Sequence, residues 1–135
     1  DYRQFQKLWI GHVLAWQFYS EMVFGNDAPF YEVPTLGGDE RMRGFRQNVF
    51  RAPFMWNVQA EYRFPIWWRF KGVVFANVGD CYHWDSMFKS QFVKVSYGIG
   101  LRFRFNEAQS HFRFDVARNN YERGVNFYIT AIEAF

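Results

Sequence analysis

The sequence predicts an all-β fold, an antiparallel transmembrane β-barrel of which this chain forms the last six strands. Three observations lead to this prediction. Apolar and polar residues alternate along most of the chain, with the period of two that a β-strand gives its side chains. Aromatic residues make up 24% of the sequence, although mean hydropathy is only −0.33. No apolar run approaches the roughly 18 residues that a membrane-spanning helix needs.

A membrane barrel accounts for this composition, because its outer face needs apolar and aromatic side chains while its inner face stays polar. The alternative is a soluble β-sandwich, whose strands also alternate. A sandwich would have to cover every apolar face with a second sheet, and here nearly every strand carries such a face opposite a charged one. The barrel is therefore favoured. The net charge of +3 comes from interspersed acids and bases, which argues against a nucleic-acid partner.

The first strand is expected over residues 5–24, followed by a long loop over residues 25–52. In this strand Leu14, Trp16 and Phe18 share one parity, and the other parity is more polar. The loop is rich in glycine, proline and charge, which are typical of irregular structure. Loops longer than about 15 residues in a compact fold are usually functional or disordered. We therefore expect this loop to carry function.

The second and third strands are expected over residues 54–66 and 69–79, and their apolar residues largely share one parity. The opposite parity of the second strand carries Asn57, Gln59, Glu61 and Arg63. The opposite parity of the third strand carries Lys71, Val73, Phe75, Asn77 and Gly79. Trp67 and Trp68 lie at the short connection between the two strands and indicate a membrane–water interface.

The remaining elements are a polar loop at 80–91, a strand at 92–105, a turn at 106–110, a strand at 111–118, a loop at 119–123 and a strand at 124–135. The connections alternate in length, as in barrels with short periplasmic turns and longer external loops. The 25–52 loop is external by this alternation. Six strands are too few to close a barrel, since the smallest have about eight. We therefore expect the chain to be the C-terminal part of a longer protein.

Several short motifs follow one another along the chain. They are Leu36-Gly37-Gly38 with Arg43-Gly44-Phe45, Ala60-Glu61-Tyr62-Arg63-Phe64-Pro65-Ile66, Phe75-Ala76-Asn77-Val78-Gly79, Gly98-Ile99-Gly100-Leu101-Arg102, Phe112-Arg113-Phe114-Asp115 and the terminal Phe135. In this order they resemble the C-terminal barrel segment of the Omp85 superfamily, in particular its BamA- and TamA-like outer-membrane assembly proteins. Two positions depart from the family pattern, since Met42 replaces the usual Val or Leu and Asn77 replaces the usual Asp.

The resemblance implies a barrel of about sixteen strands in which the 25–52 loop folds back into the lumen. It implies that Arg43 contacts the inner wall, notably the strand of Phe75, Asn77 and Gly79. It also implies that further barrel strands and periplasmic POTRA domains precede this segment, and that the first and last strands meet in a weak seam. The terminal Phe135 would end the signal by which outer-membrane proteins are recognised.

The predicted site centres on Arg43. An arginine offers five donors in a rigid fork and stays charged, so it can anchor a loop to carboxylates and carbonyls. Its candidate partners on the inner wall are Glu61, Phe75, Asn77, Gly79, Arg102 and Asp115. The loop motif itself comprises Gly37, Gly38, Arg43, Gly44 and Phe45, and we expect its glycines to provide positive φ or close backbone approach. The alternative is that Arg43 is a solvated loop charge.

Asn77 can accept a hydrogen bond from Arg43 but supplies no countercharge, so the anchor is expected to depend more on Glu61. No enzyme, metal site or cofactor is expected, because the histidines are scattered and no hydrolase motif is present. Three functions stay open. The chain could belong to an assembly factor that inserts barrel proteins through a lateral seam, to a dedicated polypeptide-secretion or lipid-handling pore, or to a passive porin.

The protein is expected in the bacterial outer membrane. The expected partners are outer-membrane lipids, unfolded outer-membrane proteins, periplasmic chaperones and accessory lipoproteins. The lipids follow from the apolar outer face of a barrel, and the other three partners from the resemblance.

Overall fold

The structure is a computed structural model that describes residues 1–24, 29, 32–83, 93–104 and 111–131. This part of the chain is built from strands, turns and loops. It contains no helix that is long and apolar enough to cross a membrane. Seven of its strands form one sheet in which every neighbouring pair is antiparallel. The predicted all-β, antiparallel fold class is confirmed.

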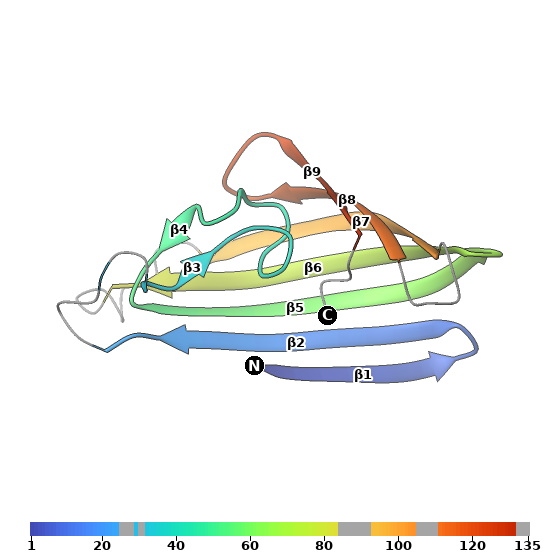
Figure 1. Cartoon of the computed structure of the whole chain (residues 1–135), viewed down its shortest axis with the longest axis horizontal. Coiled ribbons are helices and arrows are strands. Elements are labelled where there is room, and N and C mark those ends of the chain that lie inside the picture. Colours follow the sequence, from blue (N-terminus) through green and yellow to red (C-terminus); the bar gives the residue numbers. More distant parts are fainter. Residues whose placement is uncertain (25–28, 30–31, 84–92, 105–110, 132–135) are drawn as a thin grey trace.

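The strands of the large sheet are β1 (Tyr2–Trp9), β2 (His12–Met22), β5 (Phe54–Trp67), β6 (Phe70–Tyr82), β7 (Lys94–Arg104), β8 (His111–Asn119) and β9 (Val125–Thr130). Each pairs with the next in this order. The two short strands β3 (Thr35–Leu36) and β4 (Phe50–Arg51) pair with each other inside the long loop. Figure 1 shows that this loop turns back over the sheet instead of extending away from it.

The single strand predicted over residues 5–24 is wrong. β1 and β2 form a hairpin that turns at Ile10 and Gly11, with Trp9 opposite His12. Gly11 has a φ of +79°, a left-handed conformation that glycine adopts at little steric cost. The alternation is interrupted here, since Trp9 and Val13 are apolar residues on the polar parity and His12 is a polar residue on the apolar one. The single predicted strand did not take these interruptions as a turn. The described part of the chain therefore contributes seven strands to the sheet rather than six.

The other predicted strands agree with the structure apart from small differences at their ends. Residues 80–82 were predicted as loop but extend β6, and Asn119 was predicted as loop but ends β8. The predicted turn at 106–110 lies outside the described residues, and so do Phe135 and the three residues before it.

The sheet has two chemically distinct faces, as strand parity predicts. One face, called the polar face below, buries the side chains of Gln17, Asn57, Gln59, Glu61, Asn77, Ser96, Arg102, Arg113, Asp115 and Asn119. The other, called the apolar face, exposes Phe18, Ile66, Val74, Tyr97, Ile99, Phe112, Phe114, Val116, Phe127 and Ile129. An exposed apolar surface that runs across successive strands indicates contact with lipid or with another protein.

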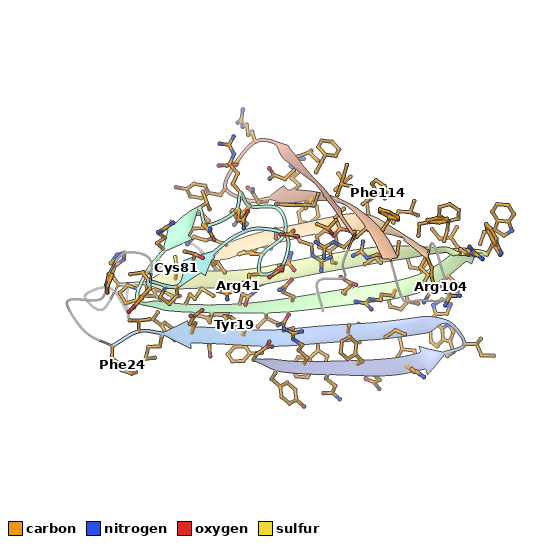
Figure 2. All side chains as sticks on the ribbon, in the orientation of Figure 1. Tyr19, Phe24, Arg41, Cys81, Arg104 and Phe114 are labelled. Atoms are coloured by element: carbon orange, nitrogen blue, oxygen red, sulfur yellow. The ribbon has the colours of Figure 1, made fainter. Side chains whose placement is uncertain are left out.

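The two ends of the sheet also differ. Trp67 and Trp68 lie at the tight β5–β6 connection, and each is 74% exposed. Arg104 lies at this end, whereas Tyr19 and Arg41 lie toward the end that carries the long loop (Figure 2). The tight connections and the long loop therefore lie at opposite ends, as the alternating connection lengths predicted.

The hydrophobic core lies between the loop and the polar face. A first cluster, called the loop cluster, consists of buried Leu36, Met42, Phe45 and Met55. A second consists of Val73, Phe75 and Ala117, with Tyr128 packed against it. Fully burying a Val, Leu, Phe or Met side chain contributes about 1.5–3 kcal/mol to stability. The loop thus takes the place that a second sheet would take in a sandwich.

Close packing across β6, β7 and β8 requires a glycine at position 98. A Cβ at Gly98 would collide with the carbonyl oxygen of Val116 and would lie 2.6 Å from the Phe75 ring. We expect Gly98→Ala to lower the free energy of unfolding by about 1–3 kcal/mol, the usual cost of overpacking. Gly124→Ala is the control, because nothing lies within 4 Å of a Cβ there. Urea unfolding of the full-length protein measures both, and equal stability of the two variants would contradict the packing.

Candidate functional site

The glycines of the loop motif have the backbone conformations that were predicted for them. Gly37, Gly38 and Gly44 have φ angles of +122°, +107° and +107°. Other residues rarely adopt this region. At Gly44 a Cβ would also lie 2.6 Å from the Cβ of Ser96. This position therefore needs glycine both for its φ angle and for its contact with the sheet.

Arg43 is fully buried against the polar face, so the alternative of a solvated loop charge is wrong. Its Nη2 donates to Glu61 Oε2 at 2.6 Å, and its Nη1 donates to Asp115 Oδ2 at 3.1 Å. Its guanidinium carbon lies 3.9 Å from the centre of the Phe75 ring. The predicted partners Glu61, Asp115 and Phe75 therefore hold one guanidinium by two ion pairs and one cation–π contact.

Glu61 and Asp115 also bind other arginines. Those are Arg63 on Glu61, Arg113 on Asp115, and Arg102 on both carboxylates. Two buried carboxylates therefore hold four guanidinium groups, and Arg113 gains a further acceptor from Asp39 of the loop at 3.1 Å. Buried charges of this kind are tolerated only when they are paired and hydrogen-bonded. Because the groups share partners, the loss of one disturbs the others.

The register of the sheet creates the space for this cluster. One row across the polar face runs through Glu61, Phe75, Gly98, Ala117 and Asn126. Gly98 and Ala117 are small, so the row is shallow beside the Phe75 ring. In β7, a Cβ at Gly100 would collide with a carboxylate oxygen of Asp115 and lie 2.7 Å from Arg102 Nη1. The polar-face glycines therefore leave room for the charged side chains.

The polar face also binds the backbone of the loop, chiefly through side-chain amides. Loop carbonyl oxygens accept hydrogen bonds as follows: Glu40 from Gln59, Arg41 from Asn57, Arg43 from Asn77 and Ser96, Gly44 from Asn119 and Asn126, and Phe45 from Tyr128. These donors come from β5, β6, β7, β8 and β9. The polar face thus fixes the path of the loop backbone as well as the position of the Arg43 side chain.

Asn77 binds a different part of Arg43 from the one predicted. Its Nδ2 donates to the Arg43 carbonyl oxygen at 3.1 Å and to Ser96 Oγ at 3.1 Å. The expectation that Asn77 accepts a hydrogen bond from the guanidinium is therefore corrected. Glu61 makes the shorter ion pair with Arg43, and Asp115 supplies the second carboxylate.

The other predicted residues take supporting positions. Phe45 is buried in the loop cluster. Gly79 lies opposite Asn57, where a Cβ would come within 2.9 Å of the Asn57 Cβ, so Gly79 makes room for an amide that holds the loop. Phe135 lies outside the described residues, and its role as a terminal signal stays a prediction.

Sequence reasoning missed several side chains that bind the loop. They are Ser96, Arg113, Asn119, Asn126 and Tyr128. Parity places Ser96 and Arg113 on the polar face, but nothing in their local sequence shows that they reach a loop residue more than 50 positions away. Asn119 escaped prediction because the loop predicted over residues 119–123 begins at this residue, which the structure places at the end of β8.

Comparison with known proteins agrees with this architecture. The sequence model of the Omp85 superfamily domain matches residues 4–135 of the chain. No curated protein sequence matches the chain. The match confirms the family that the motifs resemble, and it leaves the closer likeness to BamA and TamA as a prediction.

Removing the Arg43 side chain should destabilise the docked loop. Arg43→Ala leaves two buried carboxylates without a partner in the loop, and breaking a buried ion pair costs about 3–5 kcal/mol. The control is Arg41→Ala, since the Arg41–Glu21 pair is more than one third exposed and such pairs contribute about 0–1 kcal/mol. Urea unfolding and limited proteolysis of the loop measure the two variants. A loss no larger than that of the control would contradict the assigned role.

Restoring the family's usual carboxylate at position 77 should weaken the loop. Asn77→Asp removes the donor to the Arg43 carbonyl and places a carboxylate beside that oxygen. We expect a cost of about 1–3 kcal/mol, typical of a buried acceptor left without its donor. Faster proteolytic cleavage of the loop is the readout, with Asn120→Asp, an exposed position, as the matched control. If the loop of Asn77→Asp is cleaved more slowly than that of the wild type, residue 77 interacts with the Arg43 guanidinium and not with the Arg43 carbonyl oxygen.

Proposed function

We propose that the chain, which belongs to the Omp85 superfamily of outer-membrane β-barrel proteins, forms part of a barrel that inserts other barrel proteins into the bacterial outer membrane. The polar face would line the lumen of that barrel. The apolar face would contact lipid, and the loop would occupy part of the lumen. This arrangement would satisfy both faces of the seven-stranded sheet, one beneath the loop and the other against lipid.

The observation that carries the proposal is the buried anchor of Arg43 on Glu61 and Asp115. A passive pore needs wall charges that face hydrated ions. Here those wall charges are paired with one another and with a loop, and amide side chains hold the loop backbone as well. A barrel whose inner wall uses its charged side chains to bind a loop is better suited to handling polypeptides than to steady conduction of ions.

The apolar face supports outer-membrane lipids as a partner. Tyr97 and Ile99 on β7 are 56% and 64% exposed, and Phe127 on β9 is 74% exposed. In a bilayer such side chains are matched by acyl chains, and a cationic residue among them would cost about 2–4 kcal/mol at the midplane. The other proposed partners are unfolded outer-membrane proteins, with periplasmic chaperones and accessory lipoproteins delivering and supporting them.

A dedicated secretion or lipid-handling pore of the same superfamily is the competing function, and depletion of the full-length protein in its host distinguishes the two. An assembly factor should, when depleted, empty the outer membrane of many unrelated barrel proteins. Loss of one exported protein, or of a lipid class alone, with other barrels unaffected would instead assign the competing function.

Assembly should also depend on the Arg43 anchor. We expect Arg43→Ala, compared at equal amounts of folded protein in liposomes, to slow the folding of a test barrel protein by about tenfold, as a loss of 1.4 kcal/mol would. Arg41→Ala should fold the test protein at the wild-type rate. If the test protein also folds at the wild-type rate in the presence of Arg43→Ala, the anchor plays no part in assembly.

A further inference from the structure

The Arg43-Gly44-Phe45 segment binds directly to β9, the last strand that the structure describes. The side chain of Asn126 donates from Nδ2 to the Gly44 carbonyl oxygen. The Tyr128 hydroxyl accepts a hydrogen bond from the Gly44 N–H at 3.0 Å and donates to the Phe45 carbonyl oxygen at 2.7 Å. One hydroxyl therefore binds backbone groups of two successive loop residues, Gly44 and Phe45, so a shift of the loop along β9 breaks both bonds.

In the sheet, β9 is held by its ladder with one neighbouring strand. Within the described residues it pairs with β8 alone, from Val125 opposite Arg118 to Thr130 opposite Arg113. Its alternate side chains point to the apolar face, where Phe127 and Ile129 are more than 70% exposed. Tyr128, in contrast, packs against the second hydrophobic cluster on the polar face. Asn126 and Tyr128 therefore add contacts on the side where the loop is docked.

We infer that Asn126 and Tyr128 are positioning residues that couple the docked loop to β9, so that each stabilises the other through the same hydrogen bonds. The free energy of these bonds is lost whether the loop leaves the wall or β9 leaves β8. Linkage makes the effect reciprocal: a ligand that draws β9 out of the sheet weakens the loop by the factor by which loop release weakens β9.

The remaining loop contacts supply the comparison that isolates this coupling. Ser96 on β7 donates to the Arg43 carbonyl oxygen, and this bond holds the loop without touching β9. Loss of the Ser96 bond should loosen the loop alone. Loss of a Tyr128 bond should loosen the loop and β9 together.

In an assembly protein the coupling would transmit a displacement of β9 to the loop that carries Arg43. A client strand that pairs with β9 would then alter the loop through Asn126 and Tyr128, without touching the charged residues. This use of the coupling rests on the proposed function, whereas the coupling itself rests on the hydrogen bonds above.

Hydrogen exchange of the full-length protein in lipid nanodiscs tests the inference. In Tyr128→Phe, amide exchange should be faster by about tenfold both in residues 42–46 and in residues 125–130, since Tyr128 makes two hydrogen bonds to the loop and the variant loses both. Asn126→Asp, which keeps the shape but loses the donor, should affect the same two segments. In Ser96→Ala exchange should rise in residues 42–46 only.

Two outcomes would overturn the coupling. One is faster exchange in only one of the two segments in Tyr128→Phe. The other is equally fast β9 exchange in Ser96→Ala and Tyr128→Phe. Failure of the assembly experiment together with the expected exchange pattern would remove the proposed function and leave the coupling in place. Normal assembly without that exchange pattern would overturn the coupling and leave the proposed function in place.

Discussion

The structure depends on the burial of one guanidinium group. Arg43 has no exposed surface, and an unpaired charge in such a place would cost several kcal/mol. The loop can therefore dock only where Glu61 and Asp115 meet its side chain. These two acids come from strands that are separated by β6 and β7 in the sheet. Docking of the loop thus requires that the intervening strands are already in register, and it also stabilises that register.

The loop is held by two kinds of contact with different consequences. The Arg43 contacts depend on side-chain identity and geometry, because a guanidinium pairs with two carboxylates and an aromatic face at once. The amide contacts bind backbone carbonyls, which every residue possesses. The first kind sets where the loop docks. The second fixes its path once docked, provided that Gly37, Gly38 and Gly44 keep their positive φ angles.

The location of the core links the fold to the proposed function. A sheet with an apolar and a polar face normally buries the apolar one. This sheet instead buries its polar face beneath a loop and exposes its apolar face, which is the arrangement that a lipid environment favours. The same loop therefore completes the core and would occupy part of the proposed lumen. Movement of the loop would change the interior of the barrel and, through Asn126 and Tyr128, the hold on β9.

The sequence by itself determined the all-β class, the face on which most side chains lie, and the choice of Arg43 with Glu61 and Asp115. Parity follows from the local pleat of a strand and needs no knowledge of its neighbours. The hairpin at Gly11 was missed because the interrupted alternation at Trp9, His12 and Val13 does not by itself distinguish a turn from an irregular strand.

Only the tertiary structure decided which polar residues meet. Arg43 and Asp115 are 72 positions apart, and Gly44 and Tyr128 are 84 apart, so their contact depends on the register of several strands. The same register turned Asn77 toward the Arg43 carbonyl instead of the guanidinium. Local patterns carry no information about such distances, which is why the buried anchor was predicted and most of the donors that hold the loop backbone were not.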